Sequence, residues 1–173
     1  APDLAVTFVS PHHEAGYEKV SGLVKRLLRS AKVFGCSGGG IIGNGEEIER
    51  RPAVSITSAS LPGVEIADFH LHGGSLPDLD AGPAFWEDMV KVSSNQDPQF
   101  VVLADPFSFP VQNLLMGLDF AFSRSVKIGG MASGASQQGG NALFLNDRVY
   151  RAGAVILALH GNITVDTVVA PTT

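Results

Sequence analysis

The segment VFGCSGGGIIGNG at residues 33–45 combines a thiol, a hydroxyl and six glycines, which are residue types found in catalytic and phosphate-binding loops. Residues 35–39 read G-x-S-x-G, the spacing of the nucleophile elbow, in which Ser37 would attack a substrate carbonyl. Residues 38–43 read G-x-G-x-x-G, the fingerprint of a dinucleotide-binding loop. The two interpretations imply different chemistries and share the same glycines, so they exclude each other.

The residues after the glycines argue against both motifs. Each motif needs a helix directly after its glycines, because the helix N-terminus completes the site. Here only residues 46–51 separate Gly45 from Pro52, and three of them are glutamates. No lysine follows in the way that a P-loop requires. A hydrolase that uses Cys36 or Ser37 therefore stays as the third of our functional hypotheses, and a dinucleotide site is disfavoured.

The composition is that of one soluble globular domain over residues 1–173. The chain is 45% apolar and 17% charged, with a net charge of −5, which allows one substantial core. The acidic balance and the lack of a basic run exclude a nucleic-acid surface. No apolar run is long enough to span a membrane, and no signal peptide is visible. The single cysteine fits a reducing compartment.

An internal repeat organises the chain into two halves, residues 4–71 and 99–169. Each half predicts the order strand, helix, strand, glycine loop, strand, turn, strand, with an offset of 95 residues that grows to 101 in the hairpins. The expected elements are strands 4–11 and 99–106, helices 20–28 and 110–122, strands 32–35 and 127–130, hairpins 53–66 and 154–165, an extra strand 142–144 and, after the connector 72–83, a short helix 84–92.

The repeat predicts an α/β fold of two pseudo-symmetric strand-helix-strand-plus-hairpin units. The hairpins make the sheets mixed, and the helices pack outside them; four layers, with helices over two sheets, fit this pattern. The offset aligns Gly35 with Gly130 and Ser10 with Asp105. Both glycine loops then reach equivalent ends of the sheets, and we expect them to line one cleft between the halves.

Several ordered motifs resemble one known family. They are FGCSGGGIIGNGEEIE, PAVSITSASLPGVEIADFHL, LADPFSFP, LLMGLDFAF, VKIGGMASG and GAVILALHGNITVDTVVA. Together they resemble the N-terminal half of FIST domains over nearly the whole chain, most closely the cyanobacterial and plastid-type members. The resemblance implies a sensory, small-ligand-binding domain of signal transduction in the cytoplasm or plastid stroma, with amino acids as ligands. The family is not an established enzyme family.

The end of the chain departs from the family pattern. In the family, the segment similar to VDTVVA runs into a Q-G-C-R-P motif and a C-terminal FIST half, whereas here Ala170 is followed by Pro171, Thr172 and Thr173. The chain is then either a truncated form or the N-terminal half alone. We therefore expect as partners a small ligand and either another protein or a C-terminal FIST half, with no nucleic acid and no membrane span.

The candidate ligand site combines the two glycine loops with the acidic residue that ends strand 99–106. Backbone amides of the loops would bind the anionic end of a ligand and Asp105 the cationic end, which suits an amino acid. The candidate residues are Gly35, Cys36, Ser37, Gly38, Asp105, Gly130, Ala132, Ser133 and Gly134.

Structural roles compete with this interpretation. The glycines also fit tight turns where backbones approach closely, Asp105 also fits a helix cap, and Cys36 also fits a small buried residue. His70 and His72 would share a strand face but lack a third metal ligand. We expect no catalytic residue, no cofactor and no metal site. A scaffold that binds protein partners is the second functional hypothesis.

Overall fold

The computed structural model describes residues 1–168. The first half of the chain forms β1 (Leu4–Val9), α1 (Tyr17–Leu28), β2 (Lys32–Ser37), β3 (Gly40–Gly43), β4 (Glu46–Glu49), β5 (Val54–Ala59) and β6 (Val64–Leu71). The second half forms α2 (Pro83–Val90), β7 (Gln99–Ala104), α3 (Val111–Ala121), β8 (Lys127–Met131), β9 (Leu143–Leu145), β10 (Arg148–Tyr150) and β11 (Ala154–Gly161). Short 3-10 helices cover Pro11–Gly16, Gly73–Ser75 and Ser94–Gln96.

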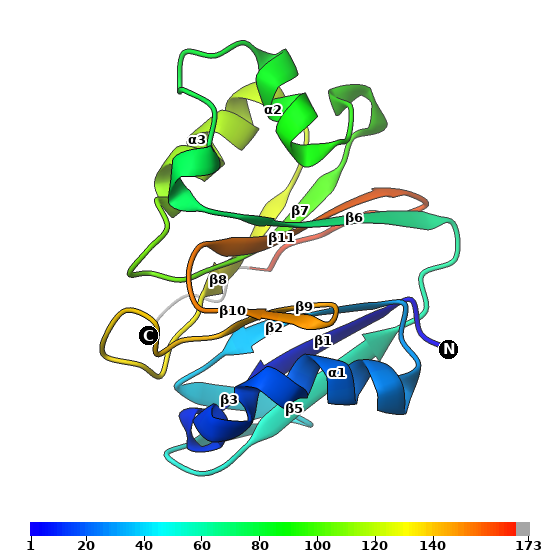
Figure 1. Ribbon diagram of the computed structural model, residues 1–173. Helices are drawn as coiled ribbons and strands as arrows, with labels where there is room; N and C mark the ends of the chain where they lie inside the picture. Colours follow the sequence, from blue (N-terminus) through cyan, green and yellow to red (C-terminus); the bar gives the residue numbers. More distant parts are fainter. Residues whose placement is uncertain (169–173) are drawn as a thin grey trace.

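Two sheets stack face to face between outer helices (Figure 1). One sheet has the order β10-β9-β2-β1-β5 and the other β6-β11-β7-β8, while β3 and β4 form a separate hairpin. The pairs β1–β2 and β7–β8 are parallel, because α1 and α3 make the crossovers between them. The mixed sheets with helices outside confirm the predicted α/β class and its four layers.

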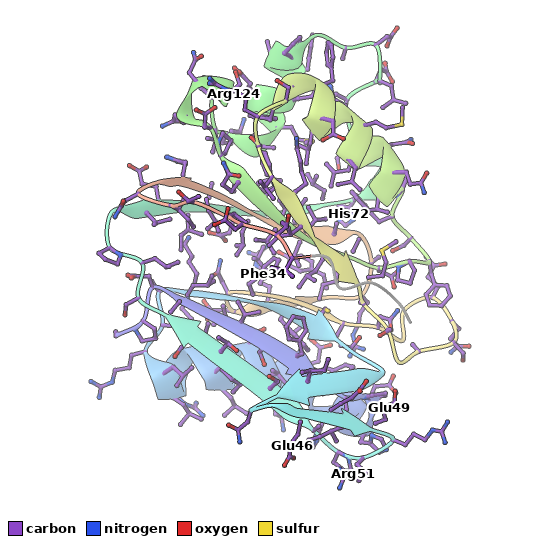
Figure 2. All side chains as sticks on the ribbon, turned by 180° about the vertical axis from the view of Figure 1, so that it is seen from behind. Phe34, Glu46, Glu49, Arg51, His72 and Arg124 are labelled. Atoms are coloured by element: carbon purple, nitrogen blue, oxygen red, sulfur yellow. The ribbon has the colours of Figure 1, made fainter. Side chains whose placement is uncertain are left out.

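Each sheet separates two apolar layers. Phe34 and Leu157 come from different sheets and meet in the cluster between them, and Figure 2 shows Phe34 in that position. Val24 of α1 packs on the outer face of the first sheet. Trp86 of α2 and Leu114 of α3 pack on the outer face of the second. Successive side chains of a strand point to opposite faces of its sheet, so each strand contributes to the apolar layer on either face.

The strand pairings of the two halves correspond. β1 lies between parallel β2 and antiparallel β5, and β7 lies between parallel β8 and antiparallel β11. Thr7 of β1 and Val102 of β7 are equivalent at the offset of 95 residues. Gly35 of β2 pairs with Thr7, and Gly129 of β8 pairs with Val102. The counterpart of Gly35 is therefore Gly129 and not Gly130, so the sequence alignment was wrong by one residue in this strand.

The positions of Ser10 and Asp105 correspond as expected. The N–H of Ser10 donates to the carbonyl of Ala53 at 3.0 Å, and the N–H of Asp105 donates to the carbonyl of Gly153 at 2.9 Å. Each bond joins the end of a central strand to the residue before its antiparallel neighbour. Superposition of the two complete halves stays a prediction.

The predicted hairpins after these strands are wrong. β6 follows β5 in the chain but pairs antiparallel with β11, from Val64↔Gly161 to Leu71↔Ala154. Residues 163–165 form no strand. The physical reason is that β11 is buried on both faces along almost its whole length, so its backbone needs a strand on each side. β7 covers one side, and β6 crosses to the second sheet to cover the other.

The glycine-rich segment forms a hairpin rather than a loop. β3 and β4 pair antiparallel, and Asn44 and Gly45 make the turn with positive φ of 52° and 77°. Glu46 and Glu49 of β4 lie on this hairpin, at the end of the molecule away from α2 and α3 (Figure 2). Within residues 1–168, none of the helices is both long and apolar enough to cross a bilayer.

Candidate functional site

A pocket of about 350 Å³ lies between the two sheets. Its volume is within the range of small-molecule sites, about 300–1,000 Å³. Its walls come from β1 and β2 on one side and from β7 and β8 on the other. The apolar wall residues are Val6, Phe8, Phe34, Val101, Leu103, Ile128 and Met131, and the remaining lining residues are Cys36, Ser37, Gly38, Gly40, Gly129, Gly130 and Ser133.

The structure brings the two predicted loops together at this pocket. Five of the nine candidate residues line it: Cys36, Ser37, Gly38, Gly130 and Ser133. The N–H of Ser133 donates to the carbonyl of Ser37 at 3.1 Å, which joins the loop after β8 to the end of β2. The polar end of the pocket is therefore built from both halves of the chain.

Three other candidate residues, Gly35, Ala132 and Gly134, do not line the pocket. An added Cβ on Gly35 would lie 1.8 Å from the carbonyl oxygen of Thr7, so this glycine permits a close backbone approach. Ala132 is buried in the cluster between the sheets. Gly134 has a φ of +99° and packs against Pro11. The tight-turn interpretation of these glycines accounts for their positions.

Several backbone amides of the two loops are already hydrogen-bonded and are not free to bind the anionic end of a ligand. Four of them donate within the protein: Gly38 to Val9 at 3.0 Å, Gly39 to Ser133 Oγ at 3.0 Å, Ala132 to Ala104 at 2.8 Å and Ser133 to Ser37 at 3.1 Å. The hydroxyl of Ser133 accepts one of these bonds and keeps its proton for donation. The polar end therefore offers a hydroxyl donor rather than a nest of amides.

Asp105 also lies behind the wall and is fully buried. Its Oδ1 accepts from Asn141 Nδ2 at 3.0 Å, and its Oδ2 accepts from Ser108 Oγ at 2.5 Å. The following helix α3 has Pro110 at its N-cap, so Asp105 does not cap it. Both carboxylate oxygens have protein donors, and the side chain is not among the residues that line the pocket.

Asn141 is the site residue that the sequence analysis missed. Besides its bond to Asp105, its Oδ1 accepts from the N–H of Ala135 at 3.2 Å and from Ser37 Oγ at 3.5 Å. The Ser37 hydroxyl in turn accepts from the N–H of Ala142 at 3.1 Å. This buried network joins the ends of β2 and β7 to the segment before β9. The short strand predicted at 142–144 was the only feature of the sequence analysis that pointed to the region of Asn141.

The nucleophile candidates lie in surroundings that do not activate them. Burial raises the pKa of the Cys36 thiol to about 12, so the neutral thiol dominates at physiological pH. Burial also raises the pKa of the Tyr17 phenol. The hydroxyl of Ser37 donates to the side-chain amide of Asn141 and accepts from the backbone N–H of Ala142, and neither group is a base.

His70 and His72 lie outside this pocket. His70 stacks on Tyr150 with ring centroids 3.7 Å apart, and its Nε2 lies 2.8 Å from the carbonyl oxygen of Ala152. Burial lowers the pKa of His70. Its neighbour His72 contacts the His70 ring edge-on. In the part of the chain that the structure describes, no three His, Cys, Asp or Glu side chains come together in a metal-binding group.

The raised pKa of Cys36 predicts a loss of stability in alkali. Between about pH 9 and pH 12 the folded state binds more protons than the unfolded state, so the free energy of unfolding falls as pH rises. Urea unfolding at pH 8 and pH 10 should show a fall about 1 kcal/mol larger in the wild type than in Cys36→Ala. Parallel pH profiles for the two proteins would contradict this assignment.

Comparison with known proteins identifies the family. The FIST N domain family model matches residues 3–172, and the chain therefore belongs to this family, whose members are generally sensory domains of signal transduction. It is 28% identical over 160 residues, 92% of this chain, to uncharacterized protein Rv0628c of Mycobacterium tuberculosis (strain ATCC 25618 / H37Rv). It is 26% identical over 161 residues, 93% of this chain, to uncharacterized protein Mb0898c of Mycobacterium bovis (strain ATCC BAA-935 / AF2122/97). The chain spans 40% of the length of each relative.

Proposed function

We propose that the pocket between the sheets binds a small, mostly apolar metabolite with one polar end, and that this binding is the sensory function of the domain. The observation that carries the proposal is an open pocket of about 350 Å³ with apolar walls and a hydroxyl end. A core that served stability alone would be filled by its own side chains. An amino acid with an aliphatic or aromatic side chain has the required size, and its carboxylate would accept a hydrogen bond from the Ser133 hydroxyl.

The lining assigns a role to each part of such a ligand. The apolar body would lie between Phe34 and Leu103, which come from the two facing sheets. The polar end would lie near Ser133, whose hydroxyl is exposed and keeps a free proton. Asp105 would have a structural role in the site. It bonds to Asn141, and Asn141 bonds to Ser37 in the pocket wall. In this arrangement Asp105 does not contact the ligand.

A thermal-shift screen against amino acids and related metabolites tests the proposal. A ligand at about 100 times its Kd adds about 2.7 kcal/mol to the free energy of unfolding. For a domain of this size, that corresponds to a rise in Tm of about 5–10 °C. We expect such a rise with at least one amino acid that has an apolar side chain.

Two glycine variants make the screen specific to the pocket. Gly130 lines the pocket, and an added Cβ there meets no atom within 4 Å, so Gly130→Leu has room to place its side chain in the ligand volume. The exposed Gly74 also has open space around it and lies outside this pocket. The shift should vanish in Gly130→Leu and persist in Gly74→Leu. A shift of equal size in both variants would place the ligand elsewhere.

A further inference from the structure

Within residues 1–168, β8 ends its sheet, and no strand pairs with its outer edge. β8 bonds to β7 at both ends: Phe100 N–H donates to Val126 at 2.9 Å, and Ala132 N–H donates to Ala104 at 2.8 Å. The backbone groups of successive strand residues point alternately to the two sides. Lys127, Gly129 and Met131 therefore direct their N–H and C=O groups away from the sheet.

The residues of β8 itself place no exposed charge on this edge. Proteins commonly protect free edges with lysine, proline or a covering element. The side chain of Lys127 is only 8% exposed and is directed to α3, where its Nζ lies 2.9 Å from Asp119 and donates to the carbonyl of Phe122 at 2.7 Å. Gly129 and Gly130 have no side chains. The backbone of β8 is therefore accessible to another chain.

The other sheet edges differ from β8. α1 contacts β10, and the Ser21 hydroxyl donates to the carbonyl of Arg148 at 3.4 Å. β5 is also an edge strand without charged residues, but β3 of the hairpin lies against it. β6 carries the exposed Glu65. Among the strands that the structure describes, β8 thus combines a free edge with a lack of exposed charge.

Apolar pockets lie on both faces of β8. On the helix side, a pocket of about 300 Å³ is formed with Val102, Val111 and Leu115. On the inner side lies the pocket between the sheets. Residues 128–131 line both pockets. Ile128 is 38% exposed and Met131 is 45% exposed, so apolar surface continues along the edge between the two pockets.

We propose that β8 is a docking edge for an extended peptide strand of a protein partner, with consecutive apolar side chains. Side chains of a strand alternate between the two faces of its sheet, which matches one apolar pocket on each face of β8. A small molecule would fill one pocket and leave the outward amides unpaired. A docked helix would satisfy its own backbone and leave those amides unpaired as well.

The test uses the acetylated and amidated peptide KTVIVTK, which presents valines on one face and isoleucine on the other. The control peptide KTVPVTK keeps the flanking residues, but its proline removes a backbone donor and disfavours strand pairing. We expect saturable binding of KTVIVTK below about 1 mM and at least tenfold weaker binding of the control. Hydrogen exchange followed by NMR should slow at least about tenfold at Lys127, Gly129 and Met131. Ile128 and Gly130 serve as internal controls, because their amides face β7.

Two methionine variants separate this edge from general apolar surface. Met131→Lys places a charge on the docking edge, whereas Met116→Lys replaces a methionine on α3 that is 59% exposed and lines neither pocket. Peptide affinity should fall at least about tenfold in Met131→Lys and stay unchanged in Met116→Lys. Absence of binding below 1 mM would overturn the proposal. Binding with no protection of the outward amides would also overturn it, even if resonances in the inner pocket shift.

Discussion

Gly35→Ala should destabilise the domain by about 3 kcal/mol or more, whereas Gly130→Ala should change its stability by less than about 0.5 kcal/mol. A Cβ on Gly35 would lie 1.8 Å from the carbonyl oxygen of Thr7, in the paired strand β1. A backbone atom cannot move aside as a side-chain end can, so β1 and β2 would have to separate. At Gly130 an added methyl group meets no atom within 4 Å.

Gly129→Ala completes this test and checks the register of the second half. Its Cβ would lie 1.8 Å from the carbonyl oxygen of Val102, and its φ of +151° is a conformation that L residues rarely adopt. We expect Gly129→Ala to lose at least as much stability as Gly35→Ala. Urea unfolding of the three variants measures the difference. A large loss for Gly130→Ala with little loss for Gly129→Ala would restore the alignment that the sequence suggested.

Local patterns in the sequence located the helices and the central strands. The spacing of Val20, Leu23 and Val24 predicted the helix that the structure shows as α1, because a 3.6-residue period is a property of a single segment. The apolar stretches ending at Ser10 and Asp105 likewise predicted β1 and β7. The turn pair Asn44-Gly45 is a typical hairpin signal, and the β3–β4 hairpin was open to prediction from it.

Pairing between distant segments was beyond a single sequence. β6 crosses to the second sheet because β11 needs a partner on each side, and the chain order of β5 and β6 suggested a hairpin instead. The one-residue register shift at Gly129 depends on hydrogen bonds between β7 and β8. The apposition of the two glycine loops was predicted, since it followed from the repeat.

The chemistry of the loops was harder to predict than their positions. Whether an amide is free depends on acceptors elsewhere, such as the Ser133 hydroxyl that accepts from Gly39. The role of Asp105 similarly depends on Asn141, which lies 36 residues further along the chain. Glycine and aspartate types are compatible with a ligand site and with an internal network, and only the tertiary contacts distinguish the two.

Asn141→Ala should destabilise the fold by about 3 kcal/mol, because the fully buried Asp105 carboxylate loses the amide donor to its Oδ1 and keeps the Ser108 hydroxyl as donor to its Oδ2. It also removes the acceptor for the N–H of Ala135. Asn162→Ala is the matched control, because that exposed side chain donates to the carbonyl of Pro62 at 3.4 Å. Its effect on the free energy of unfolding should stay within about 0.5 kcal/mol.

The double variant Asp105→Ala/Asn141→Ala tests why Asn141→Ala loses stability. The loss can come from the missing hydrogen-bond donor to Asp105 or from the missing side-chain volume. If Asn141 serves mainly to satisfy the carboxylate, removing both groups should cost at least about 1 kcal/mol less than the sum of the single variants, since no buried charge is then left without its amide donor. Urea unfolding at pH 7 provides all three free energies. Strict additivity would show that the two side chains act independently and that packing alone explains their burial. Coupling of the expected sign would show that Asn141 stabilises the fold by satisfying the Asp105 carboxylate at the end of β7.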